Sequence, residues 1–216
     1  MLQPILHKLA TQRIVLASGS PRREQILKNI NLKFEVIPST FEENLDKSSF
    51  EKPYEFVKET AKCKALQVAE KLKLQKTPAD LVIGADTIVT LDGRIFEKPK
   101  NEDDAFQMLQ TLSGRTHTVY TGVVFVIPSN QNDDCEFITK TFHEATHVTM
   151  STLTEDMIKY YIKTKEPMDK AGAYGIQEIG GTIIEGIQGD YFTVMGLPIH
   201  RLCKELVQLY KDMKIL

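Results

Sequence analysis

Apolar and polar positions follow two different periods along this chain, and each period predicts one kind of element. The run 81–91 (LVIGADTIVTL) is almost continuously apolar, which is typical of a strand buried on both faces. Between Ala105 and Leu112 the apolar residues instead repeat at i, i+3, i+4 and i+7, the spacing of an amphipathic helix. Asn101 is the expected cap of that helix, since acidic residues follow it in the first turn.

The same patterns predict strands and helices in alternation along the chain. Expected strands are 14–17, 33–37, 81–91, 118–127, 137–150 and 182–187. Expected helices begin at Pro21, after a Ser20 cap, at Pro53, after Asn101, after Thr154 (burying Met157, Ile158, Tyr161 and Ile162), and at Pro198. Asp92-Gly93 predicts a hairpin turn, and the polar loop 128–134 predicts an antiparallel pair of long strands. The expected class is α/β with a mixed sheet flanked by helices.

Composition and charge narrow the class of partner. Of the 216 residues, 42% are hydrophobic and 26% are charged, which is ordinary for a globular protein. The formal net charge is −2, so we expect neither a nucleic acid polymer nor a membrane surface as partner. A site for a small phosphorylated molecule would need locally concentrated cations.

The cysteines and the N-terminus indicate a reducing compartment. Three cysteines (Cys63, Cys135 and Cys203) without CxxC spacing do not form a disulfide framework. The chain has no apolar run of the roughly 20 residues that span a bilayer, and the first residues lack a signal-peptide core. The expected location is the cytoplasm.

The segment from Ser18 to Arg23 (SGSPRR) is a candidate anion site. It joins a predicted strand to a predicted helix, whose first N–H groups and positive dipole end favour a phosphate. Its two arginines could add charge-assisted contacts, or they could be solvated residues of a tight turn. It is not a P-loop, since GxxxxGK[ST] is missing from the chain.

Asp86 is the strongest candidate for chemistry, because a carboxylate in an apolar strand is costly to bury unless it is paired or bound to metal. Such a group could be a metal ligand or a general base, although a bulge residue is an equal alternative. Lys98 lies twelve residues later, and a hairpin at Asp92-Gly93 would bring it back alongside Asp86. A lysine there suits a phosphate as a compact charge, although this motif by itself favours an exposed turn lysine.

The run 169–177 (DKAGAYGIQ) predicts a loop with close backbone approach, because it combines two glycines with alanines. Gln177 at its end offers both a donor and an acceptor to a nucleobase edge. A plain glycine-rich loop is the alternative.

His143-Glu144-Ala145-Thr146-His147 matches the HExxH pattern of zinc proteases. That motif works on a helix, whereas the flanking residues here are β-branched and aromatic and predict a strand. In a strand the two histidines would lie about 13 Å apart, too far for one metal ion. We therefore reject a metalloprotease and expect exposed strand histidines.

Taken together, these segments resemble the Maf family of nucleotide pyrophosphatases. The matching runs are LASGSPRR (16–23), VIGADTIV (82–89), EKP (97–99), LSGRTHTVYTG (112–122), EPMDKAGAYGIQ (166–177) and GLP (196–198). The resemblance extends over a single domain, 13–216, and leaves 1–12 as an N-terminal extension. Some animal relatives join such a domain to a methyltransferase-like one.

The resemblance implies a fold similar to inosine triphosphatase, with an elongated mixed sheet and a cleft between two lobes. It implies hydrolysis of a small-molecule nucleoside triphosphate to the monophosphate and pyrophosphate, assisted by Mg²⁺ or Mn²⁺. By matching positions, Asp86 resembles the family's general base and metal ligand, and Glu42 an acid near the metal. The residues that match triphosphate-holding positions are Ser18, Arg22, Lys62 and Lys98.

Arg22, Thr87 and Gln177 match the positions that mark the subgroup cleaving dTTP and UTP. A sister subgroup acting on 7-methyl-GTP carries other residues there. Relatives commonly form homodimers, which is therefore the expected assembly. The alternative function is a non-enzymatic nucleotide-binding regulator of cell division, but a sensor has no need of the base Asp86.

Overall fold

The computed structural model describes residues 1–129 and 137–213. Its strands are β1 Ile14–Leu16, β2 Glu35–Val36, β3 Leu81–Leu91, β4 Arg94–Phe96, β5 Thr116–Pro128, β6 Phe137–Met150 and β7 Ile184–Gln188. Its α-helices are α1 Leu6–Leu9, α2 Pro21–Asn29, α3 Pro53–Leu74, α4 Glu102–Leu112, α5 Glu155–Lys163, α6 Tyr191–Met195 and α7 Ile199–Asp212. Short 3₁₀ turns are η1 Gln3–Ile5, η2 Lys47–Ser49, η3 Glu166–Asp169, η4 Ala171–Ala173 and η5 Glu178–Ile183.

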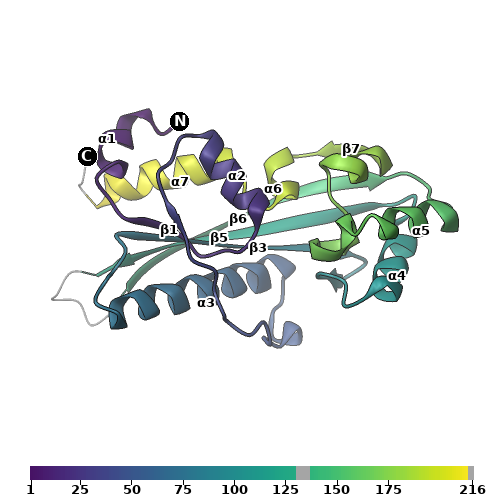
Figure 1. The fold of residues 1–216 in the computed structure, drawn as a ribbon, viewed down its shortest axis with the longest axis horizontal. Coiled ribbons are helices and arrows are strands. Elements are labelled where there is room, and N and C mark those ends of the chain that lie inside the picture. Colours follow the sequence, from purple (N-terminus) through teal and green to yellow (C-terminus); the bar gives the residue numbers. More distant parts are fainter. Residues whose placement is uncertain (130–136, 214–216) are drawn as a thin grey trace. The chain divides into compact units, whose positions relative to one another are not determined.

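The strands form one mixed sheet in the order β2-β1-β3-β5-β6-β7, and β4 pairs with β3 (Figure 1). β1 runs parallel to β2 and to β3, because the connections between them pass through helices. The pairs β3–β4 and β6–β7 are antiparallel. The mixed sheet and its flanking helices confirm the expected α/β class.

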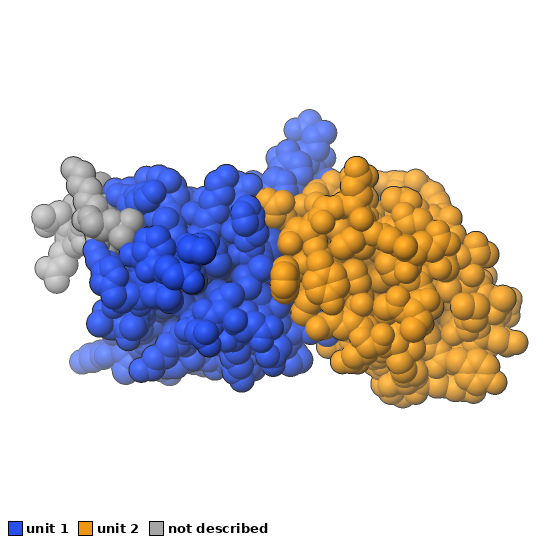
Figure 2. All heavy atoms as spheres, turned by 90° about the horizontal axis from the view of Figure 1, so that it is seen from above, with its two compact units in different colours: residues 1–86, 122–143, 196–216 blue, residues 87–121, 144–195 orange. Residues whose placement is uncertain are grey.

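Two compact units divide the chain. Unit 1 contains residues 1–86, 122–143 and 196–216, and unit 2 contains residues 87–121 and 144–195. They are blue and orange in Figure 2. Each unit has its own apolar core.

In unit 1, α3 covers one face of the sheet, and α2 and α7 cover the other (Figure 1). The α3 interface uses small side chains, because Ala61, Ala65 and Val68 pack on Val82 of β3 and Val124 of β5. Small residues let a helix approach a sheet closely, so the position of α3 is tightly determined.

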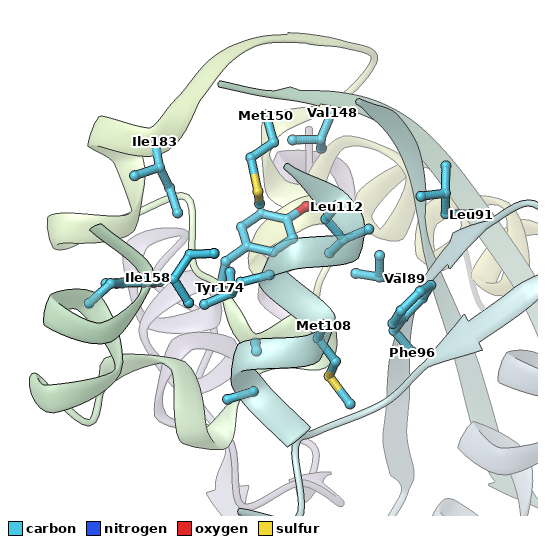
Figure 3. Close-up of a cluster of buried hydrophobic side chains, with 14 of the residues drawn as sticks. Val89, Leu91, Phe96, Met108, Leu112, Val148, Met150, Ile158, Tyr174 and Ile183 are labelled. Atoms are coloured by element: carbon cyan, nitrogen blue, oxygen red, sulfur yellow. The ribbon is translucent and has the colours of Figure 1, made fainter. Parts of the chain in front are cut away.

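In unit 2, apolar side chains of α4 and α5 pack against the sheet (Figure 3). Met108 and Leu112 come from α4, and Ile158 from α5. Tyr174 lies among them, directly after η4 and within the glycine-rich run 169–177. That segment is therefore anchored in the core of unit 2 rather than being a free surface loop.

The strongest patterns predict their elements closely. The strands at Leu81–Leu91 and Phe137–Met150 have the expected bounds, and Asn101 Oδ1 accepts a hydrogen bond from Asp104 N at 2.8 Å as the cap of α4. The Asp92-Gly93 turn also forms, with Leu91 opposite Arg94. The predicted loop 128–134 falls largely outside the described residues.

Three local predictions are wrong. The strand expected at 182–187 begins only at Ile184, because η5 occupies the residues before it. The strand expected at 33–37 is reduced to Glu35–Val36. Met157 is 44% exposed, since the buried stripe of α5 follows Ile158 and its i+3 and i+4 neighbours instead.

Candidate active site

The segment after β1 draws two of its polar side chains together in unit 1. Ser18 Oγ accepts hydrogen bonds from Ser20 N at 3.2 Å and from Arg23 Nη1 at 3.0 Å. Arg23 Nε also donates to the carbonyl oxygen of Gly196, at 2.8 Å. Pro21 opens α2 as predicted, while the Ser20 side chain makes no capping bond. Arg23, the second arginine of SGSPRR, is thus held by Ser18 near the N-terminus and by Gly196 near the C-terminus, both in unit 1.

Asp86 lies at the centre of a charged cluster in unit 1. Its carboxylate is nearly buried, with 8% of the residue exposed, and Oδ1 lies 2.7 Å from Lys64 Nζ. The same ammonium lies 2.8 Å from Glu43 Oε1. Two carboxylates therefore share one lysine, and its charge compensates the cost of burying the carboxylate of Asp86, whereas Glu43 is exposed.

Burial changes the acidity of both charged groups that face each other here. The pKa of Asp86 lies above its usual value, chiefly because burial disfavours the carboxylate, although Lys64 and Arg23 counteract the shift. The pKa of Arg23 lies below its usual value, again chiefly through burial, and the charge of Asp86 opposes that shift. A carboxylate with a raised pKa is a stronger base than a solvated one, which suits it to accept a proton from water.

Two carboxylates near Lys64 are of the chemical type that a divalent metal ion prefers. Asp86 and Glu43 direct hard oxygen donors at the same position, that of the Lys64 ammonium. Mg²⁺ and Mn²⁺ prefer such oxygens, and Mg²⁺ is commonly held by one or two carboxylates together with phosphate oxygens and water. Among the described residues, no group of three or more metal-binding side chains converges.

The close approach of α3 to β3 positions Lys64 at Asp86. A Cβ atom on Gly84 would lie 2.6 Å from the carbonyl oxygen of Ala61 and 2.7 Å from Ala65 Cβ. Only glycine fits at such distances, so residue 84 determines how near and in which rotation α3 lies. Lys64 is one turn from Ala61 and next to Ala65, at the edge of the stripe that packs on Gly84.

Lys62 and Glu42 lie elsewhere in unit 1. Lys62 Nζ lies 3.5 Å from Glu59 Oε1, and its side chain lines a cavity of about 250 Å³ with Lys58, Thr139 and others. Position 62 is on the opposite flank of the packed α3 stripe from position 64. Glu42 is exposed, and its carbonyl oxygen accepts a hydrogen bond from Asn44 N at 2.9 Å. Their roles stay predictions.

Sequence reasoning missed Lys64 and Glu43, which pair with each other beside Asp86. Arg23 belongs to the candidate segment from Ser18 to Arg23, although only Arg22 was assigned a role there. Glu43 is next to the predicted Glu42, and Lys64 is two residues after the predicted Lys62. For Lys64, the amino-acid sequence does contain a signal. This lysine borders the stripe of small residues on α3, and such a stripe packs closely on a sheet, here at Gly84.

Lys98 belongs to unit 2, where the β3–β4 hairpin carries it. The hairpin pairs Val89 with Phe96, where β4 ends two residues before Lys98. Lys98 is exposed. The glycine-rich segment contacts the same region, since Gly172 N donates to the carbonyl oxygen of Glu97 at 3.1 Å.

Thr87 begins a chain of hydrogen bonds in unit 2. Its Oγ1 lies 3.0 Å from Thr121 Oγ1, and Thr121 Oγ1 donates to the carbonyl oxygen of Thr193 at 2.7 Å. Thr121 and Thr193 are fully buried. Thr193 is fixed in turn, because both its N–H and its hydroxyl donate to Asp190 Oδ2, at 2.8 and 2.9 Å.

Gln177 is half-buried in a segment whose backbone is held by the half-buried carboxylate of Glu166. Glu166 accepts hydrogen bonds from the N–H groups of Ile179, at 3.1 Å, and Gly180, at 3.0 Å. It also accepts one from Tyr161 Oη at 2.9 Å, and Tyr161 Oη accepts from Gly175 N at 3.1 Å. The backbone on both sides of Gln177 is thereby held.

The HExxH match lies in strand β6, as predicted. His143 is half-buried rather than exposed, since its ring stacks on Tyr54 with 4.3 Å between ring centroids. His147 is exposed, and its Nδ1 lies 3.0 Å from Thr118 Oγ1. The strand conformation removes the helical spacing on which the zinc motif depends.

Comparisons with known proteins identify the family of this chain. The sequence model of one family, described as Maf-like protein, matches residues 13–209. A human protein named probable bifunctional dTTP/UTP pyrophosphatase/methyltransferase is 50% identical over 97% of this chain and 34% of its own length. A dTTP/UTP pyrophosphatase of Bacillus cereus is 46% identical over 93% of this chain and 97% of its own length. The chain thus spans about a third of the human relative and nearly all of the bacterial one.

Among solved structures, the Ham1 protein of Staphylococcus aureus is similar, with 18% identity and a TM-score of 0.43 over 65% of this chain and 72% of its own. The similarity to inosine triphosphatase therefore stays a prediction. Within the described part of the chain, no helix has the length and apolar character needed to cross a bilayer.

Proposed function

Because the chain belongs to the Maf family, we propose that it hydrolyses nucleoside triphosphates, dTTP and UTP above all, to the monophosphate and pyrophosphate. One observation carries the proposal: the nearly buried carboxylate of Asp86, 2.7 Å from Lys64 and facing Arg23. A lone acid among cations is what a triphosphate hydrolase needs, since it can accept a proton while the cations hold the phosphates.

In the proposed reaction, Asp86 accepts a proton from a water molecule whose oxygen attacks the α-phosphorus. The bond between that phosphorus and the bridging oxygen to the β-phosphate breaks, and pyrophosphate leaves with the bond's electron pair. A triphosphate carries about four negative charges, so several cations must hold it. Ser18, Arg22, Arg23 and Lys64, all in unit 1, have this role, and Lys98 is a further candidate that rests on the family resemblance alone.

A bound Mg²⁺ or Mn²⁺ would supply charge neutralisation at the phosphates. Asp86 and Glu43 would hold it, because both direct oxygens at the Lys64 position. Glu42, the acid that the family resemblance indicates, is the alternative ligand.

In this proposal, Thr87 and Gln177 of unit 2 contact the nucleobase. Together with Arg22, they match the positions that mark the subgroup cleaving dTTP and UTP. The Thr121 hydroxyl contacts Thr87 directly, and Glu166 binds the backbone N–H groups of Ile179 and Gly180, two and three residues after Gln177. A cytoplasmic location agrees with the cysteine content. A homodimeric assembly agrees with the family resemblance.

A panel of nucleotides with Mg²⁺ and with Mn²⁺ tests the activity, with pyrophosphate release as the readout. We expect dTTP and UTP to be the best substrates, and no release from any nucleotide would leave only the non-enzymatic regulator. Asp86→Asn tests the mechanism. It should lower kcat by at least about 100-fold, the scale of general base catalysis, while dTTP binding measured by calorimetry persists. Unchanged turnover in Asp86→Asn would refute the role of the carboxylate.

A further inference from the structure

A buried tyrosine and a buried histidine, neither of which the proposed reaction uses, join two distant parts of unit 2. Tyr174 Oη lies 2.6 Å from His117 Nε2, and the rings meet edge to face with 5.2 Å between their centroids. Tyr174 is 4% exposed, within the apolar cluster of Figure 3, and His117 is 2% exposed, so water does not compete for this bond. The bond therefore attaches the glycine-rich run 169–177 to strand β5.

The direction of this hydrogen bond follows from the groups that would be left unpaired. Burial lowers the pKa of His117 to about 4, against the effect of the nearby Arg115 backbone, so the ring is uncharged at neutral pH and carries one proton. Among the described residues, Tyr174 Oη has no hydrogen-bond partner besides His117, and His117 Nδ1 has none in good geometry. A proton on Nε2 would leave two groups unpaired, the phenol proton and the Nδ1 lone pair, whereas a proton on Nδ1 leaves only that N–H. Tyr174 is therefore the donor and His117 Nε2 the acceptor.

The backbone just before Tyr174 is strained, so it needs contacts that hold it. Gly172 and Ala173 have positive φ angles of 71° and 59°, and an alanine in this left-handed region costs free energy. Such a conformation persists only where the surrounding structure determines it. Here Ala173 is fully buried, and the next residue is fixed by its hydrogen bond to His117.

Gly172 connects this fixed backbone to the β3–β4 hairpin. A Cβ atom on Gly172 would lie 2.9 Å from Val89 Cγ2, so only glycine lets the segment lie this close to β3. The Gly172 N–H donates to the carbonyl oxygen of Glu97 at 3.1 Å. Because β4 ends at Phe96, this hydrogen bond holds the peptide unit between Glu97 and Lys98, which lies beyond the regular strand pairing.

We propose that His117 and Tyr174 are positioning residues for Lys98: their buried hydrogen bond fixes the run 169–177, and Gly172 of that run holds the peptide unit from which the Lys98 side chain reaches a triphosphate. The inference rests on the proposed function, in which Lys98 is a candidate phosphate contact. Lys98 is exposed, and its ammonium pairs with no acid among the described residues, so its direction depends on its backbone. A backbone fixed in advance lowers the entropy cost of ordering such a side chain on a ligand.

Tyr174→Phe tests the inference by removing a single oxygen atom. We expect KM for dTTP to rise about ten-fold while kcat stays within about three-fold of the wild type, because a displaced Lys98 weakens a contact made both before and during the reaction. Tyr210→Phe is the matched control, since Tyr210 is 3% exposed and its hydroxyl binds Gln12 in unit 1. This control should leave KM unchanged. Equal effects of the two variants on KM would overturn the inference.

Two further comparisons separate positioning from a general structural defect. In a Lys98→Met background, adding Tyr174→Phe should raise KM no further, whereas a general defect would add its own effect. His117→Gln keeps an acceptor for the phenol and should keep KM within about three-fold of the wild type, whereas His117→Leu should match Tyr174→Phe. A further rise in the Lys98→Met background, a wild-type KM in Lys98→Met alone, or a wild-type KM in His117→Leu would each contradict the proposal.

Hydrogen exchange supplies a measurement that needs no substrate. The Gly172 amide, followed by NMR, should exchange about ten-fold faster in Tyr174→Phe than in the wild type, and at the wild-type rate in Tyr210→Phe. An unchanged rate in Tyr174→Phe would overturn the inference and leave the proposed function intact. Absence of hydrolysis of every nucleotide by the wild type would instead refute the proposed function and the role of Lys98, while the exchange rates would still show whether Tyr174 holds the run 169–177.

Discussion

At the scale of single residues, burial drives opposite pKa shifts in two titratable groups of this protein. It raises the pKa of Asp86 and lowers that of His117, since in both cases the neutral form is favoured in the interior. His117 is 2% exposed, and its Nε2 lies 2.6 Å from Tyr174 Oη. Asp86 belongs to the proposed reaction, whereas His117 belongs to the core of unit 2.

We expect His117 to make stability depend on pH. Its pKa is about 4 in the folded protein against 6.5 in the unfolded chain, so its contribution is fully present above pH 6.5. The contribution is lost as pH falls from 6.5 to 4, by about 3 kcal/mol in total. Urea denaturation of the wild type and of His117→Gln at pH 7.0 and 4.5 measures it. The variant should lose less stability between the two pH values, and equal losses would contradict the prediction.

Lys64 and Lys62 form a matched pair for a second prediction. Lys64→Met removes the cation 2.7 Å from Asp86, whereas Lys62→Met removes one that pairs with Glu59 at 3.5 Å. We expect Lys64→Met to reduce kcat/KM for dTTP at least about 100-fold, the loss typical of one preorganised charge contact. Lys62→Met should retain most of the activity. The reverse order would show that the triphosphate lies against the other flank of α3.

At the scale of elements, the proposed chemistry depends on how α3 packs on β3. Ala61, Ala65 and Gly84 leave no room between the helix and the strand. The rotation of a 22-residue helix is thus decided at one point, and that rotation directs Lys64 rather than Lys62 to the carboxylate.

Gly84→Ala tests this coupling. The added Cβ would lie 2.6 Å from a backbone oxygen, which cannot move without shifting the helix, so we expect a loss of about 1–3 kcal/mol in the free energy of unfolding. Hydrolysis should fall as well, because Lys64 is displaced from Asp86. Gly186→Ala is the control, since a Cβ on this glycine of β7 meets no atom within 4 Å. Thermal unfolding and pyrophosphate release measure both; if the two variants behave alike, the packing argument fails.

At the scale of the whole molecule, the residues that precede the family match are part of a core. Leu2, Ile5 and Leu9 are at most 5% exposed, and η1 packs against α7 within unit 1. Tyr210 Oη also donates a hydrogen bond to Gln12 Oε1. Residues 1–12 therefore contribute to the apolar packing of unit 1.

Deletion of residues 1–12 should destabilise the protein. Burial of an aliphatic side chain contributes about 1.5–3 kcal/mol, so losing three should cost about 4.5–9 kcal/mol as an upper estimate. Chemical denaturation of the truncated protein measures this. Ile5→Ala should reproduce part of the loss and the exposed Gln3→Ala almost none. A truncated protein with the wild-type midpoint would show that the extension contributes nothing to the fold.

Much of the architecture could be predicted because it depends on local periodicity. The strand Leu81–Leu91 and the helix Glu102–Leu112 follow from repeating apolar positions and a cap, with no knowledge of distant residues. Patterns failed where the backbone departs from regular structure, as at η5, where Glu178 has a positive φ of 53°.

The amino-acid sequence by itself determined the α/β class and the family. It also made Asp86 a candidate site residue, since an acid within an apolar strand is recognisable without the structure. Only the tertiary structure decided that Lys64, Glu43 and Arg23 surround that acid, and that Thr121 stands behind Thr87. The physical reason is that neighbouring positions on a helix or loop face different directions. Which of them meets a given strand depends on contacts between segments far apart in the chain, here above all on the space left at Gly84.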